Sequence, residues 1–428
     1  MLCLMPARPT VVRIFLAMCT TAAVVSSVHA TEPRPGEIAP VSIRNAVHMA
    51  WRQHPDQRMA EAQLAAARAR LEAAGSPIHN PELVVEREDE GPDTTATIGL
   101  ALALDLGGKR RARQAAAAAV LSQAEAEARQ RRSRFVREWL AGWIDLRAAD
   151  LRQQLGERRL GLVERAATLA ERQFAAEDIS GLDRDLALLA RDEVQARQSG
   201  WIAERAEAEA RFRTAGGESG QLPGLSLPEG TPPAPVEIDA ATLQRLPEWR
   251  IAEAKAHAAE REVAVAQRNR TPDPVLGLRG GRVRYDNGLS DNVIGMSLSV
   301  PLFVRNGYRA EVVAARADAA AASAEAERSR AALIADSRRA VAGYAATRQA
   351  WERWRASRGT DVERRTGLLE RLWREGELST SDYLLQLDQT LDTAMAGIDL
   401  ESRLWRNYID YLAAAGQLER WVGLEDLP

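Results

Sequence analysis

Cysteine is almost absent from this 428-residue chain. Its two cysteines, Cys3 and Cys19, lie in an N-terminal segment that we expect to be removed, which excludes disulfide bonds, thiolate metal sites and cysteine nucleophiles from the mature chain. Aromatic residues make up only 5%, few for a wide globular core. The formal net charge of -3 provides no strongly basic face, so we expect no nucleic-acid partner.

Residues 1–30 have the pattern of a secretory signal peptide. Arg8 and Arg13 are their only charged side chains, an apolar stretch follows at 14–28, and small residues end the segment at Ala30. The alternative, a membrane anchor, is disfavoured because the stretch is short. We therefore expect export, with cleavage after Ala30.

Proline is missing from two long segments, 93–222 and 302–427, which are rich in alanine, arginine, glutamate and leucine. This composition predicts very long helices. The Gly/Pro-rich segment 216–240 lies between them and predicts a linker or a surface excursion outside the core.

The two halves of the chain, 31–215 and 241–428, resemble each other. Matching landmarks occur in the same order in both, and each half is predicted to contain a helix, two strands, a long helix, a turn and a returning helix. The matched pairs are His54-Pro55 with Leu246-Pro247, Asn80-Pro81 with Asp273-Pro274, Leu104-Asp105-Leu106 with Val300-Pro301-Leu302, and 174–180 with 373–379.

Period-two alternation predicts strands at about 81–89, 94–104, 274–284 and 292–302. Apolar residues alternate there with glycine, alanine or serine. The alternative is two hairpins packed on helices, but the neighbouring alanine-rich helices offer little bulky surface to cover them. A membrane β-barrel fits better, and four strands cannot close one, so the chain must oligomerise. The positions expected to face lipid are Ile98, Leu100, Leu102, Leu104, Ile294, Met296, Leu298 and Val300.

The sequence contains few patterns that are typical of enzymes. The histidines outside the leader, His48, His54, His79 and His257, form no metal-ligand cluster, and Gly107-Gly108-Lys109 lacks the remaining residues of a phosphate loop. We therefore expect no enzymatic activity, no cofactor and no metal site. Tryptophans at helical spacing or isolated in helices are predicted to pack in the interior: Trp139, Trp143, Trp351, Trp354 and Trp405.

Taken in order, these segments resemble the TolC-type outer-membrane efflux family over nearly the whole mature chain. The resemblance is carried by the opening helix Val41 to Ala66, Asn80-Pro81-Glu82-Leu83, Leu104-Asp105-Leu106-Gly107-Gly108-Lys109-Arg110, Val300-Pro301-Leu302-Phe303, and the paired segments ending at Ser180 and Ser379. The 104–110 junction further resembles the branch that serves heavy-metal (cobalt-zinc-cadmium type) resistance.

The resemblance implies a mainly α fold with a small β part. Three copies would form a periplasmic α-barrel of long antiparallel helices and share a twelve-stranded β-barrel in the outer membrane, in contact with its lipid. The function implied is the channel component of a tripartite efflux system, a passive exit duct for heavy-metal cations, with a periplasmic adaptor and an inner-membrane pump of the resistance-nodulation-division type as partners. The alternatives are a duct for drugs or secreted polypeptides and, from another class, a soluble periplasmic coiled-coil scaffold or adaptor.

Two short turns are the expected adaptor-docking tips under this resemblance. Gly376 suits a helix end, and Ser180 and Ser379 suit the N-caps of the returning helices. The alternative is that these segments are turns and nothing more. The first tip is Ala175, Ala176, Glu177, Asp178, Ile179 and Ser180, and the second is Arg374, Glu375, Gly376, Glu377, Leu378 and Ser379.

Asp183 and Asp382 each lie three residues beyond a tip serine. In a trimer they would form carboxylate rings at the periplasmic pore entrance, which would favour cations. The resemblance places a second acidic residue one turn after Asp382, where this chain has Leu385. The alternative role is favourable charge in the first turn of a helix.

Overall fold

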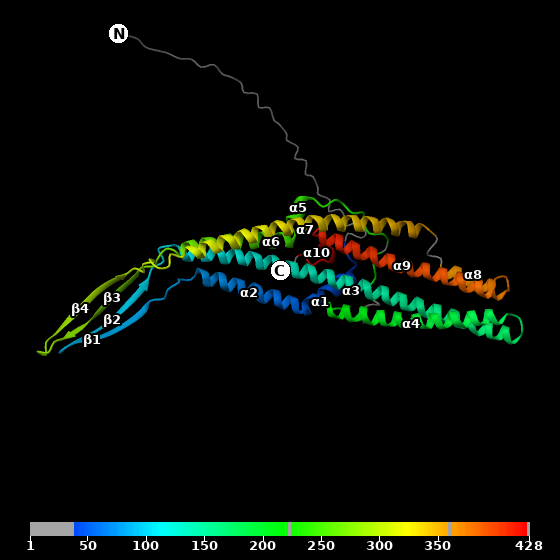
Figure 1. The fold of residues 1–428 in the computed structure, drawn as a ribbon, viewed down its shortest axis with the longest axis horizontal. Helices are drawn as coiled ribbons and strands as arrows, with labels where there is room; N and C mark the ends of the chain where they lie inside the picture. Colours follow the sequence, from blue (N-terminus) through cyan, green and yellow to red (C-terminus); the bar gives the residue numbers. More distant parts are fainter. Residues whose placement is uncertain (1–37, 219, 221–223, 229, 358–361, 426–428) are drawn as a thin grey trace, which may run out of the picture.

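The chain forms an elongated rod with a β-sheet at one end and two helix turns at the other (Figure 1). The structure is a computed structural model that describes residues 38–218, 220, 224–228, 230–357 and 362–425. The predicted signal peptide 1–30, with Cys3 and Cys19, lies outside the described residues.

The helices and strands follow one another in the order α1 (Val41–Gln53), α2 (Pro55–Gly75), β1 (Glu82–Glu90), β2 (Asp93–Ala103), α3 (Lys109–Ala175), α4 (Gly181–Thr214), α5 (Ala240–Leu243), α6 (Pro247–Arg268), β3 (Val275–Arg284), β4 (Ser290–Ser299), α7 (Arg309–Ala356), α8 (Val362–Arg374), α9 (Thr380–Ala414) and α10 (Leu418–Val422). The predicted fold class, mainly helical with four strands, is confirmed.

The long helix of the first half is continuous, whereas its counterpart in the second half is divided. α3 runs for 67 residues. The second half instead has α7, of 48 residues, and α8, of 13. α7 ends at Ala356, and the next residue, Ser357, has an extended backbone at φ -73 and ψ 145. The sequence predicted one uninterrupted helix here, because no proline marks the division. No helix within the described ranges is long and apolar enough to cross a bilayer.

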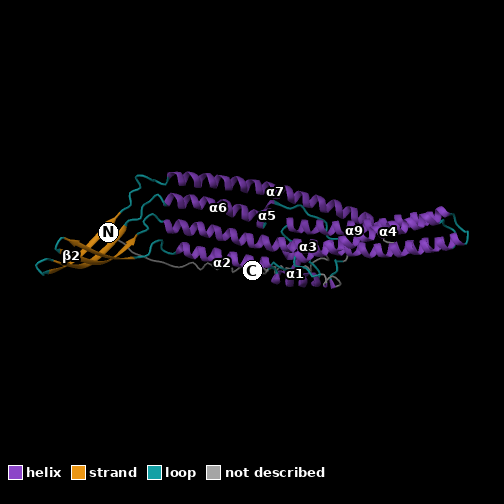
Figure 2. Ribbon diagram, turned by 60° about the horizontal axis from the view of Figure 1, so that its bottom comes forward, coloured by secondary structure: helices purple, strands orange, loops and turns teal. Residues whose placement is uncertain are grey.

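Helices from the two halves lie side by side as a curved wall (Figures 1 and 2). In the part next to the sheet the order is α2, α3, α6, α7. In the part next to the turns, α3 packs against α4 and α9, and α9 packs against α7 and α8. α3 therefore belongs to both parts of the wall.

Two pairs of helix ends meet end to end midway along this wall. Gly216 lies just after the end of α4, and a Cβ atom there would lie 3.0 Å from Cδ2 of His54, the N-cap of α2. Gly416 lies just after the end of α9, and a Cβ atom there would lie 3.2 Å from Cδ2 of Leu246, the N-cap of α6. Both glycines have positive φ, 81 and 65. His54 and Leu246 were matched as repeat landmarks, so the repeat extends to this contact.

Most of the large buried side chains gather in the middle of the rod. The main core joins α1, α3, α9 and α10 and buries Trp139, Trp143, Trp405 and Trp421 almost completely. Concentrating the few aromatic residues at one level gives a narrow rod a local core that alanine-rich helices alone would lack. Trp351 and Trp354 are half-buried and stack on each other with ring centroids 5.2 Å apart.

The described part of segment 216–240 packs more closely than a free linker. The Pro233 carbonyl accepts a hydrogen bond from the Tyr344 hydroxyl at 2.6 Å, and the Val236 N–H donates to the Tyr411 hydroxyl at 3.0 Å. Leu225 also packs against the main core. The segment therefore ties α7 to α9, and its predicted exclusion from the core is wrong in part.

All four strands form one antiparallel sheet in the order β1-β2-β3-β4. β2 pairs with β3, which joins the hairpin of the first repeat to that of the second. The sheet extends beyond the ends of the helices, which leave both of its faces uncovered (Figure 1). The alternative in which the hairpins pack on helices is therefore excluded for this chain.

Candidate functional site

One face of the sheet is apolar and exposed over all four strands. Residues directly opposite each other on neighbouring antiparallel strands lie on the same face of the sheet. Along one strand, every second residue lies on that same face. The pairing aligns Leu83, Leu100, Leu278 and Met296 in one row, and Val85, Ile98, Gly280 and Ile294 in the next. Met296 is 73% exposed and Ile294 is 91% exposed.

The predicted lipid-facing residues fall on this apolar face or at its edge next to the helices. Ile98, Leu100, Leu102, Ile294, Met296 and Leu298 lie within strands and are exposed. Leu104 and Val300 lie just beyond the ends of β2 and β4. Leu104 still donates a 2.8 Å backbone hydrogen bond to Pro274. β4 ends at Ser299, before Pro301, because proline has no N–H to donate to a ladder.

The opposite face of the sheet is built mainly from small and acidic residues, with the valines Val84, Val283 and Val293 among them. Alternation places glycine, alanine, serine and threonine there on β2, β3 and β4. At Gly281 a Cβ atom would lie 2.0 Å from the Ala96 carbonyl oxygen, so glycine is required for β2 and β3 to approach. Its acidic residues include Glu82, Glu86, Glu88, Glu90 and Asp291. This face also carries Arg279, whose guanidinium group forms an ion pair with Glu86 at 3.0 Å.

A polar cluster joins the sheet to the helices. Lys109, the first residue of α3, places its Nζ 2.9 Å from Asp273 Oδ2, and His79 Nε2 lies 3.1 Å from the same oxygen. The Lys109 and Asp273 side chains are only 12% and 11% exposed. The cluster therefore connects the segment before β1, the start of α3 and the segment before β3. Sequence reasoning missed it, although Lys109 is one of only two lysines and Asp273 is the repeat partner of Asn80.

Asp105 holds the start of α3 in place. Its carboxylate accepts hydrogen bonds from the backbone N–H groups of Lys109 at 2.9 Å and Arg110 at 2.8 Å, which are first-turn donors without a partner inside the helix. Burial raises the pKa of the Asp105 carboxyl, but these hydrogen bonds outweigh it and leave the pKa below its ordinary value.

We expect Asp105→Asn, which keeps one acceptor oxygen but loses the second acceptor and the negative charge, to lower the free energy of unfolding by about 1 kcal/mol per chain at neutral pH, the usual contribution of one hydrogen bond. Because the folded-state pKa is lowered, this stabilisation is present above the unfolded-state pKa and is lost as pH falls through the folded-state pKa. Guanidinium unfolding measures the free energy of unfolding of both proteins at pH 7 and in acid. The difference between wild type and variant should become smaller in acid. Asp318→Asn, at an exposed position of α7, is the control, and a gap independent of pH would contradict the role.

The two helix turns at the other end of the rod have the same backbone. Glu177 and Gly376 both adopt the left-handed conformation, with φ 63 and 76. The next residue of each turn donates back to the helix, Asp178 to the Gln173 carbonyl at 2.8 Å and Glu377 to Leu372 at 2.9 Å. This pattern is a Schellman motif in each turn, and it leaves few helix-end carbonyls unsatisfied. Glu177 occupies the position where the second repeat has glycine.

Ser180 and Ser379 cap the returning helices, α4 and α9. Each serine Oγ accepts the N–H of the third following residue, Asp183 at 3.2 Å and Asp382 at 3.1 Å. Each hydroxyl in turn donates to the carboxylate of that aspartate at 2.7 Å. Within one chain, Asp183 and Asp382 therefore lie in the first turns of α4 and α9, where the alternative role, favourable charge at a helix start, places them. Asp382 is exposed. Leu385, on the next turn of α9, is 58% exposed.

The predicted tip residues are brought together by these turns and are mostly exposed. All twelve are exposed except Ile179 and Leu378, which are half-buried. The turns differ in what supports them. Behind the second, Trp373 stacks on Tyr383 at 4.6 Å. Burial raises the pKa of Tyr383 to about 12. Behind the first, Arg184 lies 4.3 Å over the exposed Phe174 ring.

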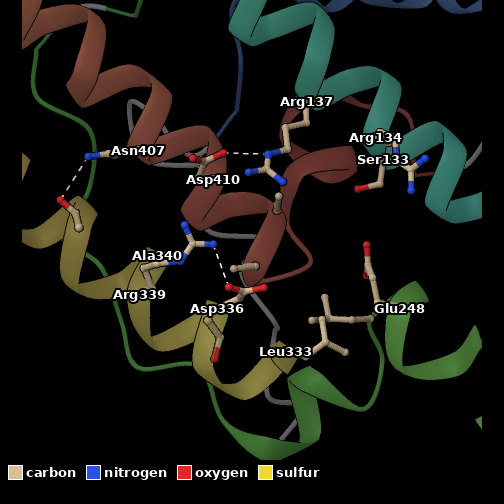
Figure 3. Close-up of a pocket in the computed structure, with 15 residues that line it drawn as sticks. Ser133, Arg134, Arg137, Glu248, Leu333, Asp336, Arg339, Ala340, Asn407 and Asp410 are labelled. Carbon is tan, nitrogen blue, oxygen red and sulfur yellow. Dashed lines mark hydrogen bonds and ion pairs between the residues drawn. The ribbon is translucent and has the colours of Figure 1, made fainter. Parts of the chain in front are cut away.

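A pocket of about 400 Å³ lies where α6 and α9 meet end to end (Figure 3). Its charged side chains come from α3, α6, α7 and α9 and largely neutralise one another. Arg137 Nε lies 2.8 Å from Asp410 Oδ1, and Arg339 Nη2 lies 2.8 Å from Asp336 Oδ1. In the described part of the chain, no group of three histidine, aspartate or glutamate side chains is arranged to hold a metal ion.

No family model and no curated protein matches the sequence. Solved structures do match. The chain resembles the CmeC outer membrane channel of Campylobacter jejuni, with a TM-score of 0.73 at 15% identity over 88% of this chain and 86% of that one. For the outer membrane protein VceC of Vibrio cholerae the TM-score is 0.69 at 19% identity, over 87% and 96% of the chains. For a membrane protein from Pseudomonas aeruginosa it is 0.71 at 20% identity, over 89% and 95%. At such identities the comparison establishes a shared fold, that of outer-membrane channels.

Proposed function

We propose that this chain, which has the fold of outer-membrane channels, is the channel component of a tripartite efflux system and acts as a passive exit duct. The observation that carries the proposal is the uncovered sheet at one end of the rod, with an apolar face across all four strands. Such a face is unstable in water and suited to lipid. The proposal gives the chain no catalytic role.

The free edges of the sheet support a homotrimer. β1 and β4 are edge strands, and in hydrocarbon each would leave a row of unpaired backbone groups. Pairing β4 of one copy with β1 of the next removes every edge once the sheet closes. Three copies would close a twelve-stranded barrel with the apolar face toward lipid and the small, acidic face toward water.

The helices support a periplasmic conduit. α3 alone, with 67 residues, spans about 100 Å at 1.5 Å per residue. The wall of helices would continue the barrel toward the inner membrane, where the two turns would meet a periplasmic adaptor. A pump of the resistance-nodulation-division type would supply the energy. Asp183 and Asp382, just inside the turns, would line the periplasmic entrance.

Membrane assembly tests the proposal directly. The full chain, expressed with its leader in a Gram-negative host, should be extracted from outer membranes as a trimer that dissociates only on heating. It should also conduct ions in planar bilayers. Recovery of a monomer by osmotic shock, stable without detergent, would instead support the periplasmic scaffold.

We propose heavy-metal cations as the cargo. Support comes from the resemblance of the 104–110 junction to the heavy-metal branch and from the excess of carboxylates on the water-facing side of the sheet. Deleting the gene should raise sensitivity to zinc, cobalt or copper salts. A loss of drug tolerance alone would support the alternative cargo, and a secretion defect would support polypeptides.

The carboxylates of β1 should make the open channel cation-selective. We expect Glu86→Gln with Glu88→Gln to lower the cation-to-anion permeability ratio by roughly a factor of three, because charges lining a water-filled passage concentrate counter-ions. Reversal potentials in a salt gradient measure the ratio. Asp89→Asn, one residue further along but on the opposite face, is the matched control. Equal shifts for both variants would contradict the assignment of faces.

A further inference from the structure

Three arginines lie on the apolar face of the sheet, toward its hairpin ends. Ala96 of β2 is directly opposite both Arg87 of β1 and Arg282 of β3. Arg284 follows two residues after Arg282 and therefore shares its face. The strand pairing places these residues on the same face of the sheet as Leu100 and Met296. Arg87, Arg282 and Arg284 are called here the arginine group.

The arginine group begins where the apolar rows end. The last apolar row contains Val85, Ile98 and Ile294, with Gly280 in β3. Along β3, Arg282 lies about 7 Å beyond this row, and Arg284 about 13 Å beyond it. On the other side, the apolar face continues toward the helices. A cationic band therefore borders the apolar band on the side away from the helices.

The positive charge of the arginine group is largely unmatched. Arg282 and Arg284 are exposed, and neither has an ion-pair partner among the residues described. Arg87 is 3.5 Å from Asp89, but both side chains are more than half exposed, and such a pair contributes little. Arg279, on the opposite face, differs because Glu86 lies 3.0 Å from it.

We infer that the arginine group binds the phosphate of a lipid headgroup, in the membrane leaflet on the hairpin side. This inference rests on the proposed function, which makes the apolar face the lipid-facing one. Arg87 and Arg282 are separated by one strand, about 10 Å, with only the small side chain of Ala96 between them. A phosphate there can accept hydrogen bonds from more than one planar guanidinium group. A lipid fits better than free phosphate, because its acyl chains would lie on the adjoining apolar rows.

Lipid retention by the purified trimer tests the inference. Wild type, the double variant Arg282→Gln/Arg284→Gln and the control Arg279→Gln are extracted from outer membranes in mild detergent, and the bound lipids that carry phosphate are quantified by mass spectrometry. We expect the double variant to retain roughly tenfold less than wild type, since each arginine near an anionic membrane surface adds to the attraction. The control should match wild type.

A second measurement uses wild type alone and does not depend on the variant folding. Micelles of a bisphosphorylated, acylated glucosamine disaccharide should raise the melting temperature of the trimer, and the enzymatically dephosphorylated lipid should not. Equal retention by wild type and double variant would overturn the inference. So would equal effects of the two lipids, or inorganic phosphate that stabilises as well as the lipid. Failure to recover a wild-type trimer from membranes would overturn the proposed function itself, and the inference with it.

Discussion

Replacing Met296 with arginine is expected to eliminate the assembled trimer from the outer membrane. Met296 lies in a central row of the apolar face and is 73% exposed in the isolated chain. An arginine on the lipid-facing side of a barrel costs about 2–4 kcal/mol at the bilayer midplane. Because each trimer carries the change three times, the total of roughly 6–12 kcal/mol approaches the whole stability of a typical domain.

Ser297→Arg is the matched control for this experiment. Ser297 is the next residue of β4 and lies on the opposite face, which would meet water in the proposed barrel. The measurement is the amount of heat-dissociable trimer in washed outer membranes at equal expression. Met296→Arg should fall below detection, while Ser297→Arg should stay near wild type. Normal assembly of Met296→Arg would show that the apolar face does not meet lipid.

Charge reversal at the two turns is expected to abolish export without disturbing the trimer. Asp178 and Glu377 hold equivalent places in the two turns, and both side chains are exposed. Only their backbone N–H groups serve the Schellman motifs, so lysine can replace them without loss of those bonds. An adaptor surface that complements acidic turns would meet repulsive charge, which costs several kcal/mol when like charges are juxtaposed.

The double variant Asp178→Lys/Glu377→Lys should therefore lose adaptor binding by at least about tenfold, the factor that corresponds to 1.4 kcal/mol. Crosslinking to the adaptor in cells and growth on the toxic cargo would measure binding and export separately. Asp318→Lys, on α7 near the sheet end, provides the control. Wild-type crosslinking by the double variant would contradict docking at the turns and leave them as simple helix connections.

Much of the fold could be predicted because, in a narrow rod, the helices, strands and caps are determined largely by residues close together in the sequence. The absence of proline predicted long helices, and α3 runs for 67 residues. Period-two alternation predicted the strands. Ser180 and Ser379 were predicted as caps, and both accept the expected backbone hydrogen bond. Each of these features depends on residues close together in sequence, where spacing alone carries the information.

What the sequence could not predict depends on contacts between distant residues. The Lys109–Asp273 pair joins residues 164 positions apart, and no local pattern connects them. The arginine group emerges only once β2 is known to pair with β3. Glu177 has the same left-handed backbone as Gly376, although glutamate gives no local signal for it. The roles of the tips and of Asp183 and Asp382 remain predictions, since they depend on partner chains.

The end-to-end helix contacts have a mechanical consequence. Where α4 meets α2 and α9 meets α6, the helical hydrogen bonding is interrupted at the middle of the rod, whereas α3 and α7 pass this level unbroken. Tilting one of those helices against its neighbour breaks no backbone hydrogen bond within either helix. Bending α3 by the same angle strains the backbone hydrogen bonds within α3. Compliance is therefore concentrated at one level of the molecule, and in the proposed trimer this level would let the half that bears the turns widen while the half that bears the sheet stays closed.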